Sequence, residues 1–128
     1  MTAAPLVLVV EDEALLALEI EDLLLAAGFA ARLASDGRAA LAQPAERLAA
    51  AVIDLNLGTG MQGRDVIRLL RQRRPDLPVV VVTGYTPGAA QADLRGLGGP
   101  TARLQKPIDP ARLIQRLRDA ISSTNGIA

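Results

Sequence analysis

Five short apolar runs recur along this chain at nearly even intervals, and this rhythm restricts the possible folds more than any other feature. The runs begin at residues 6, 29, 51, 79 and 101. Parallel strands need connections of about a dozen residues or more, so each interval has room for one helix. The runs are nearly continuous in Val, Ile, Leu and Ala, which is typical of strands covered on both faces. The five predicted strands are Leu6–Val10, Phe29–Ala34, Ala51–Leu55, Val79–Val82 and Thr101–Leu104.

The stretches between these runs are predicted to be helices. Apolar residues recur at helical spacing in the first, third and last of them, whereas Pro44 interrupts the second and the fourth has glycines around it. We therefore predict one α/β domain over residues 1–128, with its core at 6–121 and a frayed tail at 122–128. Its sheet is predicted to be parallel, doubly wound and flavodoxin-like, with strand order 2-1-3-4-5 and five helices. The predicted helices are Ala14–Ala27, Gly37–Leu48, Arg64–Arg73, Ala89–Leu97 and Ala111–Ile121.

The composition excludes several functional classes. Lys+Arg and Asp+Glu both number 14, and one Tyr, one Phe and no Trp leave little for stacking on bases, so we expect no nucleic-acid partner. Without Cys or His, the chain has no disulfide, no usual zinc site and no Ser-His or Cys-His couple. The longest apolar run near the N-terminus, Pro5–Val10, is far shorter than the ~20 residues of a membrane span. We expect a cytoplasmic domain, without a membrane partner, whose chemistry rests on carboxylates, hydroxyls, Lys or Arg.

Polar residues follow four of the five predicted strands. Doubly wound sheets bind ligands at the carboxyl ends of their strands, where the strand order reverses. Each residue alone has an ordinary explanation, such as acids at a helix start or a turn-forming Asp, but their joint placement is hard to obtain by chance. The residues are Glu11 and Asp12 after the first strand, Asp54 and Asn56 at the third, Thr83 at the fourth, and Lys106, the single lysine, after the fifth.

Crowded acids of this kind require a cation, and oxygen ligands without His or Cys indicate Mg²⁺. A carboxylate beside Mg²⁺ and an ammonium can attack a phosphoryl group, because the cations neutralise charge on the phosphoryl oxygens. The hydroxyl of Thr83 can then donate a hydrogen bond to the product. The sequence thus indicates aspartyl-phosphate chemistry.

These residues resemble the receiver domain of response regulators in two-component phosphorelays, over about residues 6–121. The likeness rests on Val-Val-Glu-Asp-Glu at 9–13, Val-Ile-Asp-Leu-Asn-Leu at 52–57, Val-Val-Thr-Gly-Tyr at 81–85 and Gln-Lys-Pro at 105–107. The resemblance implies a signalling domain rather than an enzyme. Such a domain catalyses its own phosphorylation and its own slow dephosphorylation. It also implies a histidine kinase or histidine phosphotransfer protein as donor and a downstream protein partner. Both a stand-alone regulator and a receiver from a hybrid histidine kinase fit.

The resemblance also implies a role for each site residue. Asp54 is the phosphoacceptor, and the Mg²⁺ ligands are Glu11, Asp12, Asp54 and the main-chain carbonyl of Asn56. Lys106 pairs with the phosphoryl group, Thr83 is the switch hydroxyl, and the Lys106–Pro107 peptide is cis.

Two departures from the family pattern stand out. Gly63 follows Asp54 by nine residues rather than the eight common in receivers, so the loop between them is one residue longer. Many receivers also carry an aromatic residue two or three positions before the lysine, where this chain has Leu104 and Arg103. The loop at residues 83–85 is similar to that of a receiver subgroup with Phe-Ala-Thr-Gly-Tyr. Our hypothesis is that Tyr85 takes over the signalling movement.

Three other functions compete with this interpretation. Residues 58–63 match the G-x-G-x-x-G pattern of dinucleotide sites, but no acid closes the following strand and Asp54 would repel a pyrophosphate. A haloacid-dehalogenase-type phosphatase also forms an aspartyl-phosphate, yet it needs a second Asp where this chain has Asn56. An interaction module without chemistry would not need Lys106 to meet the acids.

Overall fold

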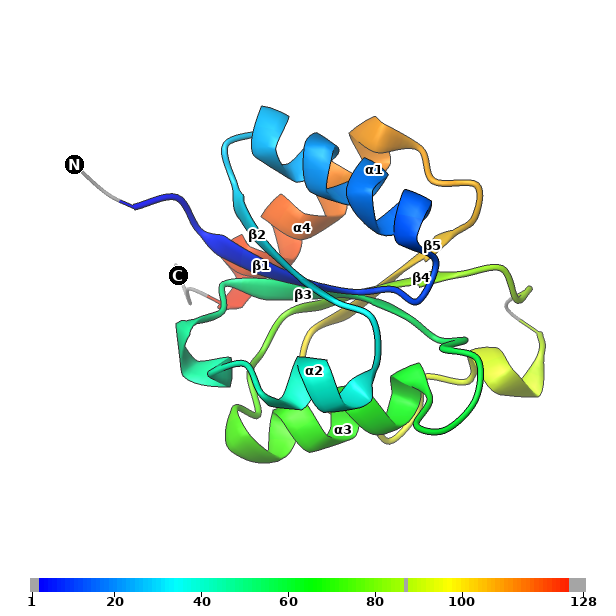
Figure 1. The fold of residues 1–128 in the computed structure, drawn as a ribbon. Helices are drawn as coiled ribbons and strands as arrows, with labels where there is room; N and C mark the ends of the chain where they lie inside the picture. The colour runs from blue at the N-terminus through cyan, green and yellow to red at the C-terminus, as the bar shows by residue number, and fades with distance from the viewer. Residues whose placement is uncertain (1–2, 87, 125–128) are drawn as a thin grey trace.

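A computed structural model describes residues 3–86 and 88–124, and it contains the predicted parallel sheet (Figure 1). All neighbouring strands are parallel, and their order β2-β1-β3-β4-β5 confirms the doubly wound topology. Every residue of the two strands β3 and β4 is buried, which explains why they are almost wholly apolar. The strands are β1 Leu6–Val10, β2 Ala30–Ala34, β3 Ala50–Asp54, β4 Val79–Thr83 and β5 Thr101–Gln105.

Helices cover both faces of the sheet. In Figure 1, α1 and α4 lie on one face, and α2 and α3 lie on the other. Two buried apolar layers hold them there: Ile20, Leu24, Leu113 and Leu117 belong to the first, and Val66, Ile67 and Leu70 to the second. The α-helices are α1 Ala14–Ala26, α2 Gly37–Leu41, α3 Gly63–Arg73 and α4 Pro110–Thr124, and two short 3₁₀ turns are η1 Ala45–Arg47 and η2 Ala90–Ala92. Within the described ranges, none of these helices is long and apolar enough to cross a membrane.

The prediction of five helices is wrong at the fourth. The described part of the chain has four α-helices, and the range expected to form the fourth, Ala89–Leu97, contains only the single turn η2. Gly96, Gly98 and Gly99 adopt positive φ angles of 82°, 68° and 60°. These values are outside the helical region, so no helix continues through residues 96–99.

Two further boundaries differ from expectation. The second predicted helix is divided into α2 and η1, because Pro44 lies between them and has no N–H to continue the helix. The last predicted helix, Ala111–Ile121, is longer than expected, since α4 spans Pro110–Thr124. Residues 125–128 lie outside the described part of the chain.

Arginine side chains from the end of α3 bind the irregular segment that follows α2. The Arg73 guanidinium donates to the carbonyls of Leu41 and Gln43, at 2.5 and 3.4 Å. The Arg74 guanidinium donates to the carbonyl of Leu48, after η1. A planar guanidinium with five N–H donors can satisfy several carbonyls at once, which an ammonium does less well. This use accounts for part of the excess of arginine over lysine.

Candidate functional site

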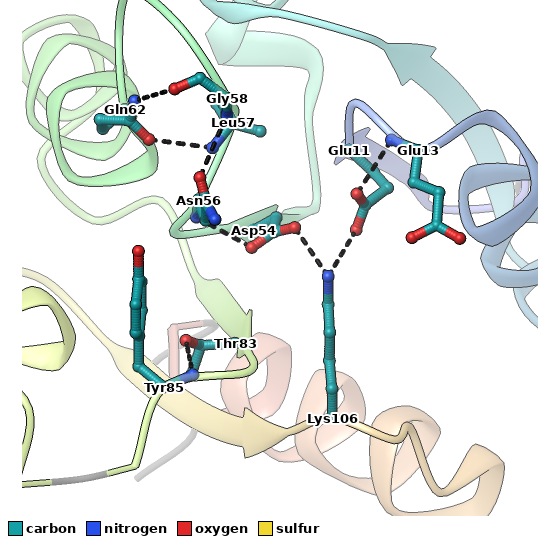
Figure 2. A network of polar contacts seen from close by, with 10 residues as sticks. All are labelled: Glu11, Glu13, Asp54, Asn56, Leu57, Gly58, Gln62, Thr83, Tyr85 and Lys106. Atoms are coloured by element: carbon teal, nitrogen blue, oxygen red, sulfur yellow. Dashed lines mark hydrogen bonds and ion pairs between the residues drawn. The ribbon is translucent and has the colours of Figure 1, made fainter.

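Acidic side chains from the ends of β1 and β3 meet in one cleft (Figure 2). Carboxylate oxygens of Glu11, Asp12 and Asp54 all lie within 4.8 Å of one another. Glu11 and Asp54 are buried, with 3% and 4% exposure, whereas Asp12 is exposed. The cleft has a volume of about 410 Å³, and its lining residues are Glu11, Asp12, Glu13, Asp54, Asn56, Gly58, Gly84, Tyr85 and Lys106. The structure thus brings the three predicted acids together.

Lys106 enters this cluster from the end of β5. Its Nζ lies 2.8 Å from Asp54 Oδ2 and 3.4 Å from Glu11 Oε1. Its backbone N–H donates to the carbonyl of Thr83 at 2.8 Å, which ties the loop after β5 to β4, and the Lys106–Pro107 peptide that follows is cis. Partial burial lowers the pKa of Lys106, but the hydrogen bond and charge of Asp54, aided by Glu11, outweigh burial and leave that pKa raised. The ammonium is therefore charged at neutral pH.

Glu11 is the acid whose ionisation the site changes most. Burial raises its pKa to about 7, and the nearby charge of Asp54 acts in the same direction. The Glu13 N–H, which donates to Glu11 Oε2 at 3.1 Å, and the charge of Lys106 lower the pKa but do not cancel the effect of burial. A further cation bound beside this carboxylate would lower its pKa, because opposite charge favours the ionised form.

The donor set fits a divalent cation such as Mg²⁺. Among the described residues, Glu11 Oε1 is a buried oxygen that accepts no hydrogen bond, and its recorded ion-pair partner is Lys106. Carboxylate and carbonyl oxygens are the ligands that Mg²⁺ prefers, and they suit soft or nitrogen-seeking metals poorly. Glu11, Asp12 and Asp54 could hold the ion, with the main-chain carbonyl of Asn56 beside them.

The loop from β3 to α3 holds the phosphoacceptor candidate in place. Asp54 Oδ1 accepts a hydrogen bond from the N–H of Asn56 at 2.9 Å. A Cβ at Gly63 would lie 2.2 Å from the carbonyl oxygen of Asp54, so only glycine lets α3 begin this close to β3. The one-residue-longer loop therefore still ends in a glycine against the strand. Gly58, whose φ is 76°, lies beside Asp12, and such an acidic setting disfavours the pyrophosphate of a dinucleotide.

Thr83 and Tyr85 lie on the β4 side of the site. Thr83 is fully buried, and its Oγ1 accepts a hydrogen bond from the N–H of Tyr85 at 2.9 Å. Gly84 and Tyr85 line the cleft, whereas Thr83, the last residue of β4, is not one of its lining residues. Figure 2 shows the Tyr85 side chain pointing toward the loop that carries Asn56. In this structure Thr83 Oγ1 is therefore bound, as an acceptor, to the backbone of its own loop.

Two residues near the cleft were not singled out as site residues by sequence reasoning. Glu13 lines the cleft, and the signal for it is its place as the third acid of the run after β1. Gln62 hydrogen-bonds the backbone of the β3–α3 loop, and its contacts are to main-chain atoms that the sequence does not distinguish.

Comparisons with known proteins agree with this geometry. A family model described as the response regulator receiver domain matches residues 7–118. The transcriptional regulatory protein TctD of Salmonella typhimurium is 37% identical over 122 residues, which are 93% of this chain and 53% of that protein. This chain therefore spans about half the length of that curated relative. The neutral charge of the 128 residues gives no information about nucleic-acid binding by the remainder of such relatives.

Solved structures agree with this family match. A sensor protein from Polaromonas is 35% identical, with a TM-score of 0.80, and the match covers 94% of this chain and 98% of that one. The receiver domain of a sensor histidine kinase from Pseudomonas aeruginosa is 26% identical, with a TM-score of 0.81 and coverage of 94% and 99%. That structure has a magnesium ion coordinated in its active-site cleft.

Proposed function

Because this chain belongs to the response regulator receiver domain family, the phosphoacceptors of two-component signalling, we propose that Asp54 accepts the phosphoryl group. The motif resemblance to this family is thereby confirmed, and the phosphatase alternative is not favoured. The observation that carries the proposal is the 2.8 Å contact between Lys106 Nζ and Asp54 Oδ2 inside a cluster of carboxylates. The proposed donor is the phosphohistidine of a histidine kinase or of a histidine phosphotransfer protein.

The proposed transfer is a single displacement at phosphorus. An oxygen of Asp54 attacks, a P–O bond to the carboxylate forms, and the P–N bond to the donor imidazole breaks, leaving its electron pair on nitrogen. The Lys106 ammonium is already beside Asp54 and stabilises charge on the phosphoryl oxygens without moving far. Mg²⁺, held by Glu11, Asp12, Asp54 and the Asn56 carbonyl, would supply further neutralisation of that charge. Slow attack by water on the same phosphorus would break the P–O bond to Asp54, release inorganic phosphate and return the Asp54 carboxylate to its free form.

The proposed signal is a change in the loop after β4. The Thr83 hydroxyl would donate a hydrogen bond to a phosphoryl oxygen while its Oγ1 still accepts from the Tyr85 N–H, so a shift of Thr83 toward the phosphoryl group would carry the backbone of Tyr85 with it. A downstream protein would then bind the altered surface.

We place this domain in the cytoplasm, as part of the same proposal, and a chain without cysteine suits that compartment.

The proposal is tested by chemical phosphorylation. Incubation with acetyl phosphate and Mg²⁺ is expected to add one phosphoryl group, which peptide mass spectrometry assigns to Asp54. The Asp54→Ala variant is expected to acquire none, whereas the exposed Asp119→Ala control is expected to match the wild type. An adduct that persists in Asp54→Ala would contradict the proposal. Sustained turnover of phosphate esters would favour the phosphatase.

Mg²⁺ binding is expected to weaken as the pH falls through 7. Ionised Glu11 binds the cation, and the protonated form, which dominates below its pKa of about 7, does not. Between pH 8 and pH 6 the apparent affinity should fall about tenfold, because proton and metal compete for one carboxylate. Calorimetric titration at each pH measures this change. The Glu11→Gln variant should bind more weakly with a flatter pH profile, and an equally steep profile there would refute the assignment to Glu11.

A further inference from the structure

The side chain of Gln62 connects the start of α3 to the loop that leaves the phosphoacceptor. Its Oε1 accepts a hydrogen bond from the N–H of Leu57 at 2.9 Å (Figure 2). Its Nε2 donates to the carbonyls of Gly58 and Gly60, at 2.7 and 3.3 Å. The backbone N–H of Gln62 in turn donates to Asp65 Oδ2 at 3.2 Å, which fixes Gln62 to the first turn of α3. One side chain thus contacts three backbone positions of the loop.

The contact with Leu57 has a consequence for the metal site, because of peptide geometry. The N–H of Leu57 and the carbonyl of Asn56 belong to one peptide group, which is planar and trans. In such a group the two bonds point in nearly opposite directions. Holding the N–H toward Gln62 therefore sets the direction of the Asn56 carbonyl.

The other end of the loop is fixed beside Asp54. The Asn56 N–H donates to Asp54 Oδ1, and Gly63, the residue after Gln62, packs against the Asp54 carbonyl with its N–H donating to the Leu55 carbonyl at 3.1 Å. Between these points lie Gly58 and Gly60, both at positive φ. Glycine gives the backbone little conformational restraint of its own, so the loop needs a side chain to hold one conformation.

We propose that Gln62 is a positioning residue for cation binding, which orients the main-chain carbonyl of Asn56 through the Leu57 N–H. This inference rests on the proposed function, since it assumes that the Asn56 carbonyl is a ligand. Groups that orient metal ligands typically change metal affinity by about 10- to 100-fold when they are removed. The effect belongs to binding, so a high cation concentration should restore the rate of phosphorylation.

The test measures the binding of Mg²⁺, without a phosphodonor, by calorimetry. The fluorescence of Tyr85 is a second readout, because Tyr85 lines the cleft and is the single tyrosine of a chain without Trp. Gln62→Met keeps the length of the side chain and removes every polar atom, and it is expected to raise the Kd about tenfold. Gln62→Glu keeps an acceptor for Leu57 and is expected to recover affinity relative to Gln62→Met. At saturating Mg²⁺, both should be phosphorylated within about twofold of the wild-type rate.

The controls separate this inference from its premise. Gln115→Met removes an exposed glutamine of α4 whose side chain, among the described residues, donates to Asp119, and its Kd should equal that of the wild type. Thermal unfolding in EDTA verifies that each variant is folded, and Gln62→Leu, which also removes every polar atom of the side chain, replaces Gln62→Met in the test if Gln62→Met does not fold. A Gln62→Met Kd within twofold of wild type, or an equal loss in both Gln62 variants, would overturn the inference. Failure of the wild type itself to bind Mg²⁺ would instead overturn the proposed function.

Discussion

Replacing Lys106 by methionine is expected to slow phosphoryl transfer to Asp54 by about 100-fold or more, and yet to strengthen Mg²⁺ binding. The slower transfer follows from the loss of the ammonium that lies 2.8 Å from Asp54 Oδ2, where it stabilises charge on the phosphoryl oxygens. The tighter binding follows from Coulomb repulsion, because the same ammonium opposes a second cation among these acids, and its removal should lower the Kd by about threefold or more. Rates with acetyl phosphate and calorimetric Kd values at pH 8 measure the two effects.

The choice of pH matters for this comparison. Lys106 lowers the pKa of Glu11, so removing the ammonium lets that carboxyl hold its proton more strongly. At pH 8 the proton competes with Mg²⁺ for the Glu11 carboxylate less than it does at neutral pH. Lys106→Arg should keep the Mg²⁺ affinity near the wild-type value but transfer slowly, because a guanidinium is larger than the compact ammonium. Arg112→Met, which removes an exposed cation of α4, should change neither quantity. Slower transfer combined with weaker Mg²⁺ binding in Lys106→Met would contradict this account.

The sheet and the acidic cleft were predictable because both follow from residue type and chain order. Apolar runs at the observed spacing imply parallel strands, and the strand order then places the residues after β1, β3 and β5 at one edge. Residue type and strand order were therefore enough to predict that Asp12, Asp54 and Lys106 lie together. The sequence also carried the position of Gly63, although only the structure gives the reason, which is the contact of α3 with the Asp54 carbonyl.

The loop in place of the fourth helix could not be predicted in the same way. Its Ala and Leu residues favour a helix, and its glycines oppose one, so the outcome depends on tertiary contacts. In the structure its carbonyls accept hydrogen bonds from distant arginines: Arg103 bonds Ala92, and Arg64 bonds Arg95 at 3.4 Å. Every residue has a backbone carbonyl, so the sequence does not mark which carbonyl a given side chain will bind. The contacts of Gln62 with its loop could not be predicted for the same reason. Pairings of this kind appear only in the structure.

Arg71 makes several contacts of this kind, and it binds the same loop. It is 6% exposed, and it forms none of the ion pairs recorded for the described residues. Burial lowers its pKa to about 10, so it remains charged at neutral pH. A buried cation without an acid is stable only where other oxygens surround it. Its acceptors are the carbonyls of Leu77 (2.9 Å), Leu97 (3.5 Å), Gly98 and Pro100 (2.6 Å), and the hydroxyl of Thr101 (2.7 Å).

Substitution of Arg71 by methionine is therefore expected to lower the free energy of unfolding by about 3 kcal/mol or more. Methionine fills the space of the aliphatic stem but leaves the buried carbonyls of Leu77 and Leu97 without this donor, and each unsatisfied buried group costs about 1–3 kcal/mol. Arg71→Lys should lose less, because one ammonium keeps the charge but cannot reach acceptors on both sides of the guanidinium plane. Urea unfolding measures the free energies, and hydrogen exchange at residues 97–101 should accelerate first. Arg68→Met, on the same helix but exposed and with its ion pair to Asp65 on the surface, should cost less than about 1 kcal/mol. A loss of that small size at Arg71 would mean that the loop after η2 is held by its apolar contacts instead, through Ala92 and Leu97 in the core.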